Sequence, residues 1–131
     1  MLHSLRIVVA LLASFLTLTV LLTSCGGAAT RVAPYTFELS SEPIQPRSGQ
    51  AATVKARITD QAGNPVNGAK VTMQREHLDA AHERPTSDAT EAEPGVYATR
   101  VNFSMSGRWK VTVGAEGPEG RAQRDFELQV Q

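Results

Sequence analysis

Apolar side chains recur at every second position over most of the chain beyond residue 34. The clearest run covers residues 52–58, where alanine, valine and isoleucine alternate with threonine, lysine and arginine. Similar runs occupy residues 35–39, 69–73, 97–103, 109–113 and 126–130. Successive side chains of a strand point to opposite faces of a sheet, so this period predicts strands with one buried face. No long stretch has the 3.6-residue period of a helix.

Turn residues separate the predicted strands. Glycine, asparagine and proline stand within residues 60–65, and Gly-Pro-Glu-Gly occupies residues 117–120. Glycine supplies positive φ angles and proline favours extended neighbours, so both segments predict turns, and the second predicts a hairpin. Six or seven short strands joined in this way predict an all-β fold, a single antiparallel immunoglobulin-like β-sandwich over residues 35–131. Trp109 is the side chain most expected in its core.

The first residues of the chain predict an export signal instead of a strand. Residues 7–22 carry no charged side chain and follow the single basic residue Arg6. A membrane-spanning helix needs roughly 20 apolar residues, so this stretch is short for a span and suits the core of a signal peptide. An uncleaved N-terminal anchor is the alternative. Both interpretations place the remainder of the chain outside the cytoplasm, at a membrane surface.

The tetrad Leu-Thr-Ser-Cys that ends at Cys25 resembles the lipobox of bacterial lipoproteins. In those proteins the cysteine becomes the first mature residue and carries acyl chains such as palmitate, and a thiolate is the nucleophile that such a linkage requires. The resemblance implies a lipoprotein signal peptide at residues 1–24. A small, polar tether with lipidated Cys25 then covers residues 25–34. Two or three acyl chains, at about 0.8 kcal/mol per buried CH₂, would hold the protein on the membrane.

Charge and motif content exclude several classes of function. The chain has 13 basic and 13 acidic residues, so it lacks the basic face that nucleic-acid binding requires. Its single cysteine excludes a disulfide within the chain. There is no Gly-x-Ser-x-Gly turn and no glycine-rich phosphate loop after a strand. These observations favour a protein that is not an enzyme.

Three motifs carry a resemblance to a known family: Asp60-x-x-Gly63-x-Pro65-Val66, Gly95-x-Tyr97 and Gly107-x-Trp109-x-Val111-x-Val113. Together with Phe103 they resemble the YtkA-like domain, a small extracytoplasmic sandwich akin to FixH-type membrane proteins and to copper-resistance sandwiches. The resemblance covers about residues 35–130. It implies the same sandwich, with Tyr97, Phe103 and Trp109 filling the core. It also implies copper handling, because many members carry a stretch rich in methionine and histidine between two of these strands.

The corresponding segment of this chain holds Met73, His77 and His82 without a compact cluster. Residues 79–94 are expected to form a long loop, and residues 76–94 contain six acids against one base. An acidic loop with two histidines attracts divalent cations, and the thioether of Met105 would suit copper. If the strand stayed extended, the Cα atoms of Met73 and His77 would lie about 13 Å apart, too far to share a metal. The alternatives are a core position for Met73, packing of Met105 on Trp109, and solvated histidines.

Two hypotheses for function follow. In the first, a membrane-anchored extracytoplasmic lipoprotein acts as a non-enzymatic binding or accessory protein in copper handling, with the candidate ligands His77, His82, Met105 and Met73. In the second, the sandwich binds no metal and docks an envelope protein, such as a respiratory or transport complex, through strand edges or the long loop.

Overall fold

The computed structural model of the chain describes residues 33–80 and 84–131. The predicted signal peptide, Cys25 and His82 lie outside these residues. The described part contains no helix that could cross a membrane. Val32–Gln131 forms one compact unit, and its core side chains all come from residues 35–130. The domain therefore has a hydrophobic core of its own.

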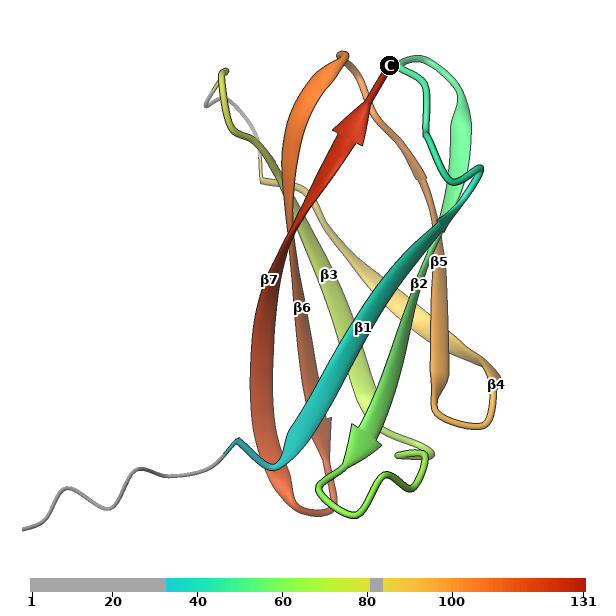
Figure 1. The fold of residues 1–131 in the computed structure, drawn as a ribbon, viewed down its shortest axis with the longest axis vertical. Helices are drawn as coiled ribbons and strands as arrows, with labels where there is room; N and C mark the ends of the chain where they lie inside the picture. The colour runs from blue at the N-terminus through green and yellow to red at the C-terminus, as the bar shows by residue number, and fades with distance from the viewer. Residues whose placement is uncertain (1–32, 81–83) are drawn as a thin grey trace, which may run out of the picture. The chain divides into compact units, whose positions relative to one another are not determined.

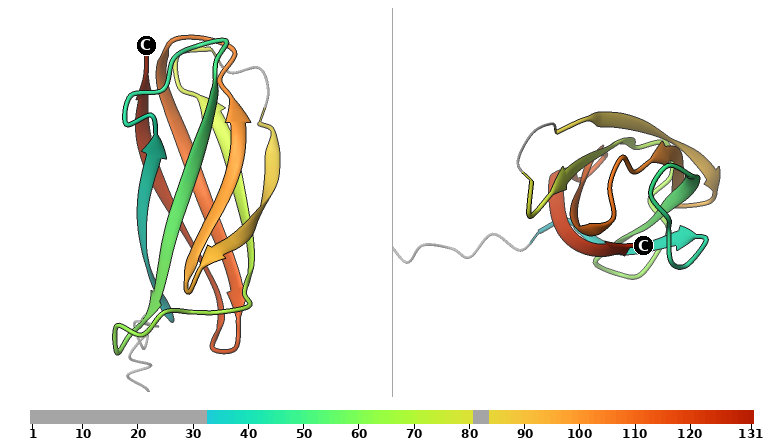
Figure 2. Two further views of the ribbon diagram at one scale, coloured as in Figure 1. Left: turned by 90° about the vertical axis from the view of Figure 1, so that its right-hand side faces the viewer. Right: turned by 90° about the horizontal axis from the view of Figure 1, so that it is seen from above.

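Seven strands make up this domain (Figure 1). Their bounds are β1 (Tyr35–Glu42), β2 (Ala51–Asp60), β3 (Lys70–His77), β4 (Thr86–Glu93), β5 (Val96–Asn102), β6 (Gly107–Gly117) and β7 (Gly120–Val130). All neighbouring strands pair antiparallel, in the order β1-β2-β5-β4-β3-β6-β7. Seen from above, the sheet curls around a common interior (Figure 2). The predicted all-β antiparallel sandwich is confirmed.

Strand β4 lies within residues 79–94, where the sequence predicts a loop, so the loop prediction is wrong over this part. Its first half pairs with β3 from Thr86 to Ala89, and its second half pairs with β5 from Thr90 to Glu93. The strand therefore passes from one half of the sheet to the other. Its side chains are mostly exposed. Because neither face of β4 is buried along its length, the strand has no apolar period of two.

The core is made by the inward faces of the other strands. Trp109, Tyr97 and Phe103, the aromatic residues expected there, are 5%, 1% and 0% exposed. Aliphatic side chains of β2, β3 and β6 form most of the remaining cluster, and β1, β5 and β7 also contribute to it. The Tyr97 hydroxyl donates a hydrogen bond to the Val66 carbonyl at 2.8 Å and accepts one from the Ala69 amide at 2.9 Å. These bonds tie the connection between β2 and β3 to β5.

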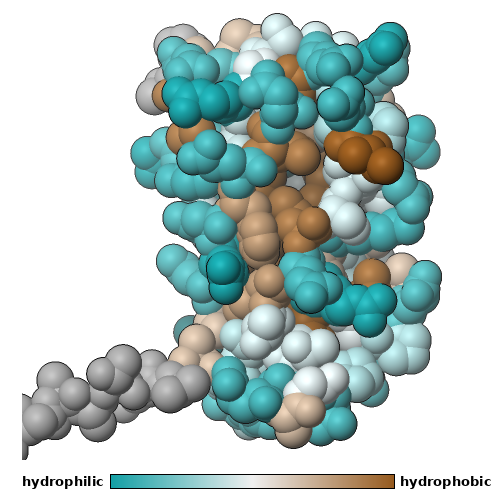
Figure 3. Space-filling model, in the orientation of Figure 1, coloured by the Kyte–Doolittle hydropathy of each residue, from teal (hydrophilic) through white to brown (hydrophobic). Residues whose placement is uncertain are grey.

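The two end strands of the sheet, β1 and β7, lie side by side without being paired neighbours (Figure 1). Apolar surface is visible along this side of the molecule (Figure 3). A groove of about 310 Å³ here is lined by Leu39, Ile44, Phe126 and Leu128, among others. After β1 the chain crosses to the end of β7, where Gln131 exchanges backbone hydrogen bonds with the segment that follows β1.

Candidate functional site

The inward face of β3 changes from apolar to polar along the strand. Val71 and Met73 are 1% and 0% exposed and belong to the core. Arg75 and His77 follow on the same face and are 9% and 7% exposed. The period of two therefore continues to the end of the strand, but with a guanidinium and an imidazole in place of aliphatic groups.

Arg75 and His77 line a cavity of about 410 Å³, which we call the end pocket. Its other lining residues are Ala80, Pro85, Asn102, Ser104, Met105 and Trp109. They come from the ends of β3 and β5, the start of β6 and the connections between them. The parts of the chain that supply these residues meet at the end of the domain opposite the start of β1 (Figure 1).

His77 is held by partners on both ring nitrogens. Nε2 lies 2.9 Å from the Ser106 carbonyl oxygen, and the Asp79 amide donates to Nδ1 at 3.3 Å. A carbonyl only accepts, so this arrangement corresponds to a neutral ring with its proton on Nε2. The ring meets Trp109 edge to face, with the centroids 5.1 Å apart. His77 is therefore packed and hydrogen-bonded as a part of the pocket wall.

The backbone conformation and the surroundings of Gly107 explain why the β6 motif begins with a glycine. Its φ angle is +121°, and a Cβ atom at this position would lie 2.8 Å from Nε2 of His77. No other residue type combines this backbone conformation with so close an approach. Two residues later, the Trp109 indole N–H donates to the Met105 carbonyl at 3.1 Å. The Gly-x-Trp pair thus builds one wall of the end pocket.

Arg75 is the most unusual group in the end pocket. One terminal nitrogen donates to the Ser87 hydroxyl at 3.3 Å, and the buried Nε has no hydrogen-bond partner among the described residues. Loss of solvent lowers the pKa of Arg75 from its ordinary value. Arginine nevertheless keeps its proton in proteins, so a positive charge stands at the pocket wall.

The structure places three of the four candidate copper ligands. Met73 lies in the hydrophobic core, fully buried, whereas Met105 is 39% exposed. Met105 and His77 line the same pocket, and His82 lies outside the described residues. Over residues 33–80 and 84–131, no three His, Cys, Asp or Glu side chains are grouped as a metal site. A copper ion at His77 and Met105 would also meet the positive charge of Arg75, so the pocket is a poor fit for a cation.

Arg75, Asn102 and Ser104 line the end pocket but were not predicted from the sequence as site residues. The inward position of Arg75 could have been predicted from the sequence. Val71 and Met73 alternate along the strand, and the same period of two places residue 75 on the inward face. Asn102 and Ser104 carry no comparable signal. They flank the end of β5, and only the pairing of the strands brings them next to the end of β3.

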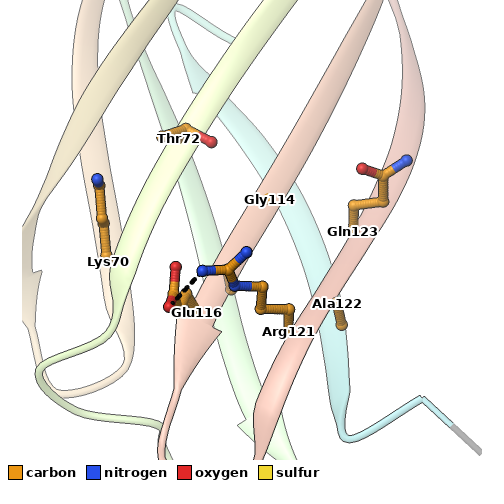
Figure 4. A pocket seen from close by; sticks show the side chains of 8 residues that line it. Lys70, Thr72, Gly114, Glu116, Arg121, Ala122 and Gln123 are labelled. Atoms are coloured by element: carbon orange, nitrogen blue, oxygen red, sulfur yellow. Dashed lines mark hydrogen bonds and ion pairs between the residues drawn. The ribbon is translucent and has the colours of Figure 1, made fainter.

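A second hollow lies on the outer face of β3, β6 and β7 (Figure 4). It has a volume of about 550 Å³, and the small residues Gly114 and Ala122 are part of its lining. Arg121 is directed at Glu116 across it and forms an ion pair of 2.8 Å. The charges of this pair are thus matched within the surface itself. Arg75 of the end pocket takes part in none of the five ion pairs among the described residues, so the end pocket is the stronger candidate site.

The YtkA-like family model matches residues 30–114. Among solved structures, the chain resembles an engineered protein at 17% identity and a TM-score of 0.52, over 76% of this chain and 21% of that one. It also resembles the PmoD soluble domain from Methylocystis sp. ATCC 49242 (Rockwell), at 11% identity and a TM-score of 0.48, over 72% and 90% of the two chains. A CARDB domain from Pyrococcus furiosus in complex with di-metal ions matches at 12% identity and 0.41, over 74% and 87%. A comparison with curated proteins found no match.

At this identity the likeness to the engineered protein concerns the fold alone, and the chain spans about a fifth of that protein's length. The family match is of another kind, because it rests on the sequence itself and covers more than half of the chain. It includes all of β1 to β5 and most of β6, with Gly107 and Trp109. The chain therefore belongs to the YtkA-like family.

Proposed function

We propose that this protein is a non-enzymatic binding or accessory domain, held by a lipid on Cys25 at the extracytoplasmic face of a bacterial membrane. The YtkA-like membership and the lipobox at Cys25 support the location and the non-enzymatic character. The observation that carries the binding role is the end pocket. Its lining residues come from the end of the domain opposite the start of β1.

The size and lining of the end pocket support binding of a small molecule. Its volume of about 410 Å³ lies in the range of ligand pockets, roughly 300–1,000 Å³. Such pockets combine apolar walls with a few polar groups that converge. Trp109 and Met105 supply the walls here, and Arg75, Asn102 and Ser104 supply the polar groups.

Copper handling is the second candidate, favoured by one observation: His77 and Met105 line the same pocket. An imidazole with a thioether suits copper. Binding would require His77 to give up its bond to Ser106 or to Asp79, and the ion would face Arg75. We therefore expect weak binding.

Docking to an envelope protein is the alternative role. The groove between β1 and β7 supports it, because Ile44 is 86% exposed there and both strands end the sheet. Affinity capture from detergent-solubilised membranes tests this role. A partner recovered at stoichiometric yield by the native protein, and lost with Ile44→Lys, would support it. Equal recovery with both would contradict it.

Membrane fractionation tests the anchor. The native protein should remain in the membrane fraction after a high-salt wash, and metabolic labelling with palmitate should mark it. Cys25→Ser should abolish the label. If the native protein stays in the membrane without the label and keeps residues 1–24, the uncleaved anchor is the correct interpretation.

Calorimetric titration of the domain that begins at Val32 tests the copper candidate. Cu(I) and Cu(II) are titrated separately into the native domain and into His77→Ala, Met105→Leu and His82→Ala. Micromolar or tighter binding that His77→Ala and Met105→Leu each abolish would support copper handling. Binding weaker than micromolar, or binding that survives both changes, would end it.

A further inference from the structure

The positive charge of Arg75 has no counter-ion among the described residues. The five ion pairs of this part of the chain all involve other cations. The two nearest acids in the sequence are already engaged. Glu76 points to the other face of β3 and pairs with Arg84 and Lys110, at 2.7 and 2.8 Å. Asp79 pairs with Arg108 at 3.1 Å.

A buried, unpaired guanidinium is costly. Removing an ion from water costs several kcal/mol, and a partner of opposite charge recovers part of that cost. Many buried groups avoid the cost by becoming neutral, but arginine keeps its proton. The bond to Ser87 engages one N–H of a terminal nitrogen, and Nε has no acceptor among the described residues. Within residues 33–80 and 84–131, Arg75 thus has both a charge without a counter-ion and an N–H donor without an acceptor.

The other lining residues of the end pocket indicate which class of ligand could bind there. None of the lining residues that the structure describes is acidic. Asn102 and Ser104 offer neutral hydrogen-bonding groups, and both are exposed at the pocket mouth. Trp109, Met105 and Pro85 offer apolar surface. A ligand that suits these walls carries an oxyanion at one end and an apolar portion at the other.

We propose that the end pocket binds a small organic anion, whose carboxylate or phosphate group is held by Arg75 and whose apolar portion packs on Trp109. The planar fork of a guanidinium matches both kinds of oxyanion, with two parallel N–H···O bonds. This inference rests on the proposed binding function and names the ligand class of the same site. It also accounts for the poor fit of the pocket to a copper ion.

Trp109 makes the proposal directly measurable, because it is the single tryptophan of the chain and lines the pocket. The domain from Val32 is titrated with hexanoate, hexyl phosphate, inorganic phosphate and the neutral analogue hexanol, while Trp109 fluorescence is recorded. We expect a saturable change with hexanoate or hexyl phosphate, and binding at least about tenfold weaker with hexanol, since charge-assisted bonds are the strong ones. The two apolar anions distinguish a carboxylate ligand from a phosphate ligand. Inorganic phosphate shows whether the apolar portion is needed.

Variants then assign the binding to Arg75. Arg75→Met should weaken anion binding at least about tenfold, whereas Arg100→Met, which removes an exposed arginine of β5, should leave it unchanged. If Arg75→Met does not fold, Asn102→Asp provides an independent test. A carboxylate at position 102 would act as a built-in counter-ion, so the variant should bind anions more weakly and melt at a higher temperature than the native domain.

Several results would overturn the proposal. Equal affinity for hexanol and hexanoate would show an apolar cavity without anion recognition. A tighter anion complex in Asn102→Asp, or equal losses in Arg75→Met and Arg100→Met, would remove Arg75 from the site. If no anion binds but copper does so through His77 and Met105, the ligand class is wrong and the binding function stands. If neither binds, both proposals fail.

Discussion

The hydroxyl of Tyr97 should be a major stabilising group of this domain, and Tyr97→Phe removes it alone. The phenol ring is 1% exposed and packs in the core, so phenylalanine keeps the same apolar contacts. Only the bonds to the Val66 carbonyl and the Ala69 amide, at 2.8 and 2.9 Å, are lost. The change therefore separates hydrogen bonding from packing.

The magnitude follows from these two bonds. A hydrogen bond contributes about 0.5–1.5 kcal/mol net, and a buried group that loses its partner costs about 1–3 kcal/mol. Val66 is 6% exposed, so its carbonyl has little access to water once the hydroxyl is gone. Ala69 is only partly buried, and water can solvate its amide. We therefore expect Tyr97→Phe to lower the free energy of unfolding by about 2–4 kcal/mol.

Urea denaturation of the domain from Val32, followed by Trp109 fluorescence, measures this change. Tyr35→Phe is the matched control, because the Tyr35 hydroxyl accepts a single bond, from the Glu119 amide at 2.8 Å, and should contribute about 1 kcal/mol. A loss smaller for Tyr97→Phe than for Tyr35→Phe would refute the reasoning. The slope of the transition should be the same in all three proteins, because the surface exposed on unfolding is unchanged.

Two further predictions concern a glycine and a carboxylate. Gly107→Ala should destabilise the domain by about 1–3 kcal/mol because of its φ angle of +121°, and by a further amount because the new Cβ would clash with His77. Gly120→Ala is the control: its φ angle is +124° but its Cβ would meet open space, so it should show the backbone cost alone. Equal losses of stability for the two variants in urea denaturation would exclude the clash. The pKa of Glu91 is held below its ordinary value because two backbone N–H groups donate to its carboxylate at 3.0 and 2.9 Å. The stabilisation of the fold by ionised Glu91 should be complete above the unfolded-state pKa of about 4.3, and it should be lost as pH falls through the lower pKa of the folded state. The melting temperature of Glu91→Gln should therefore fall less on acidification than that of the native domain. Parallel pH profiles for the two proteins would contradict this assignment.

The position of most strands, and the aromatic content of the core, follow from the sequence alone. The reason is that the alternation of apolar and polar side chains shows which face of a strand is buried, whichever strands pair with it. Residues 97–103 and 109–113 show this, and they supply Tyr97, Phe103 and Trp109 to the core. The turn residues at 117–120 likewise predict the hairpin that joins β6 to β7.

Only the tertiary structure decided the course of β4 and the make-up of the end pocket. A strand whose two faces are mostly exposed has no apolar period, so β4 exists because β3 and β5 offer it backbone partners. The pocket depends on long-range pairing in the same way. Antiparallel register places the end of β3 beside the start of β6, so that His77 stands opposite Trp109. Strand pairing is a contact between distant segments, and the local pattern of a segment carries information about its burial but not about its neighbours.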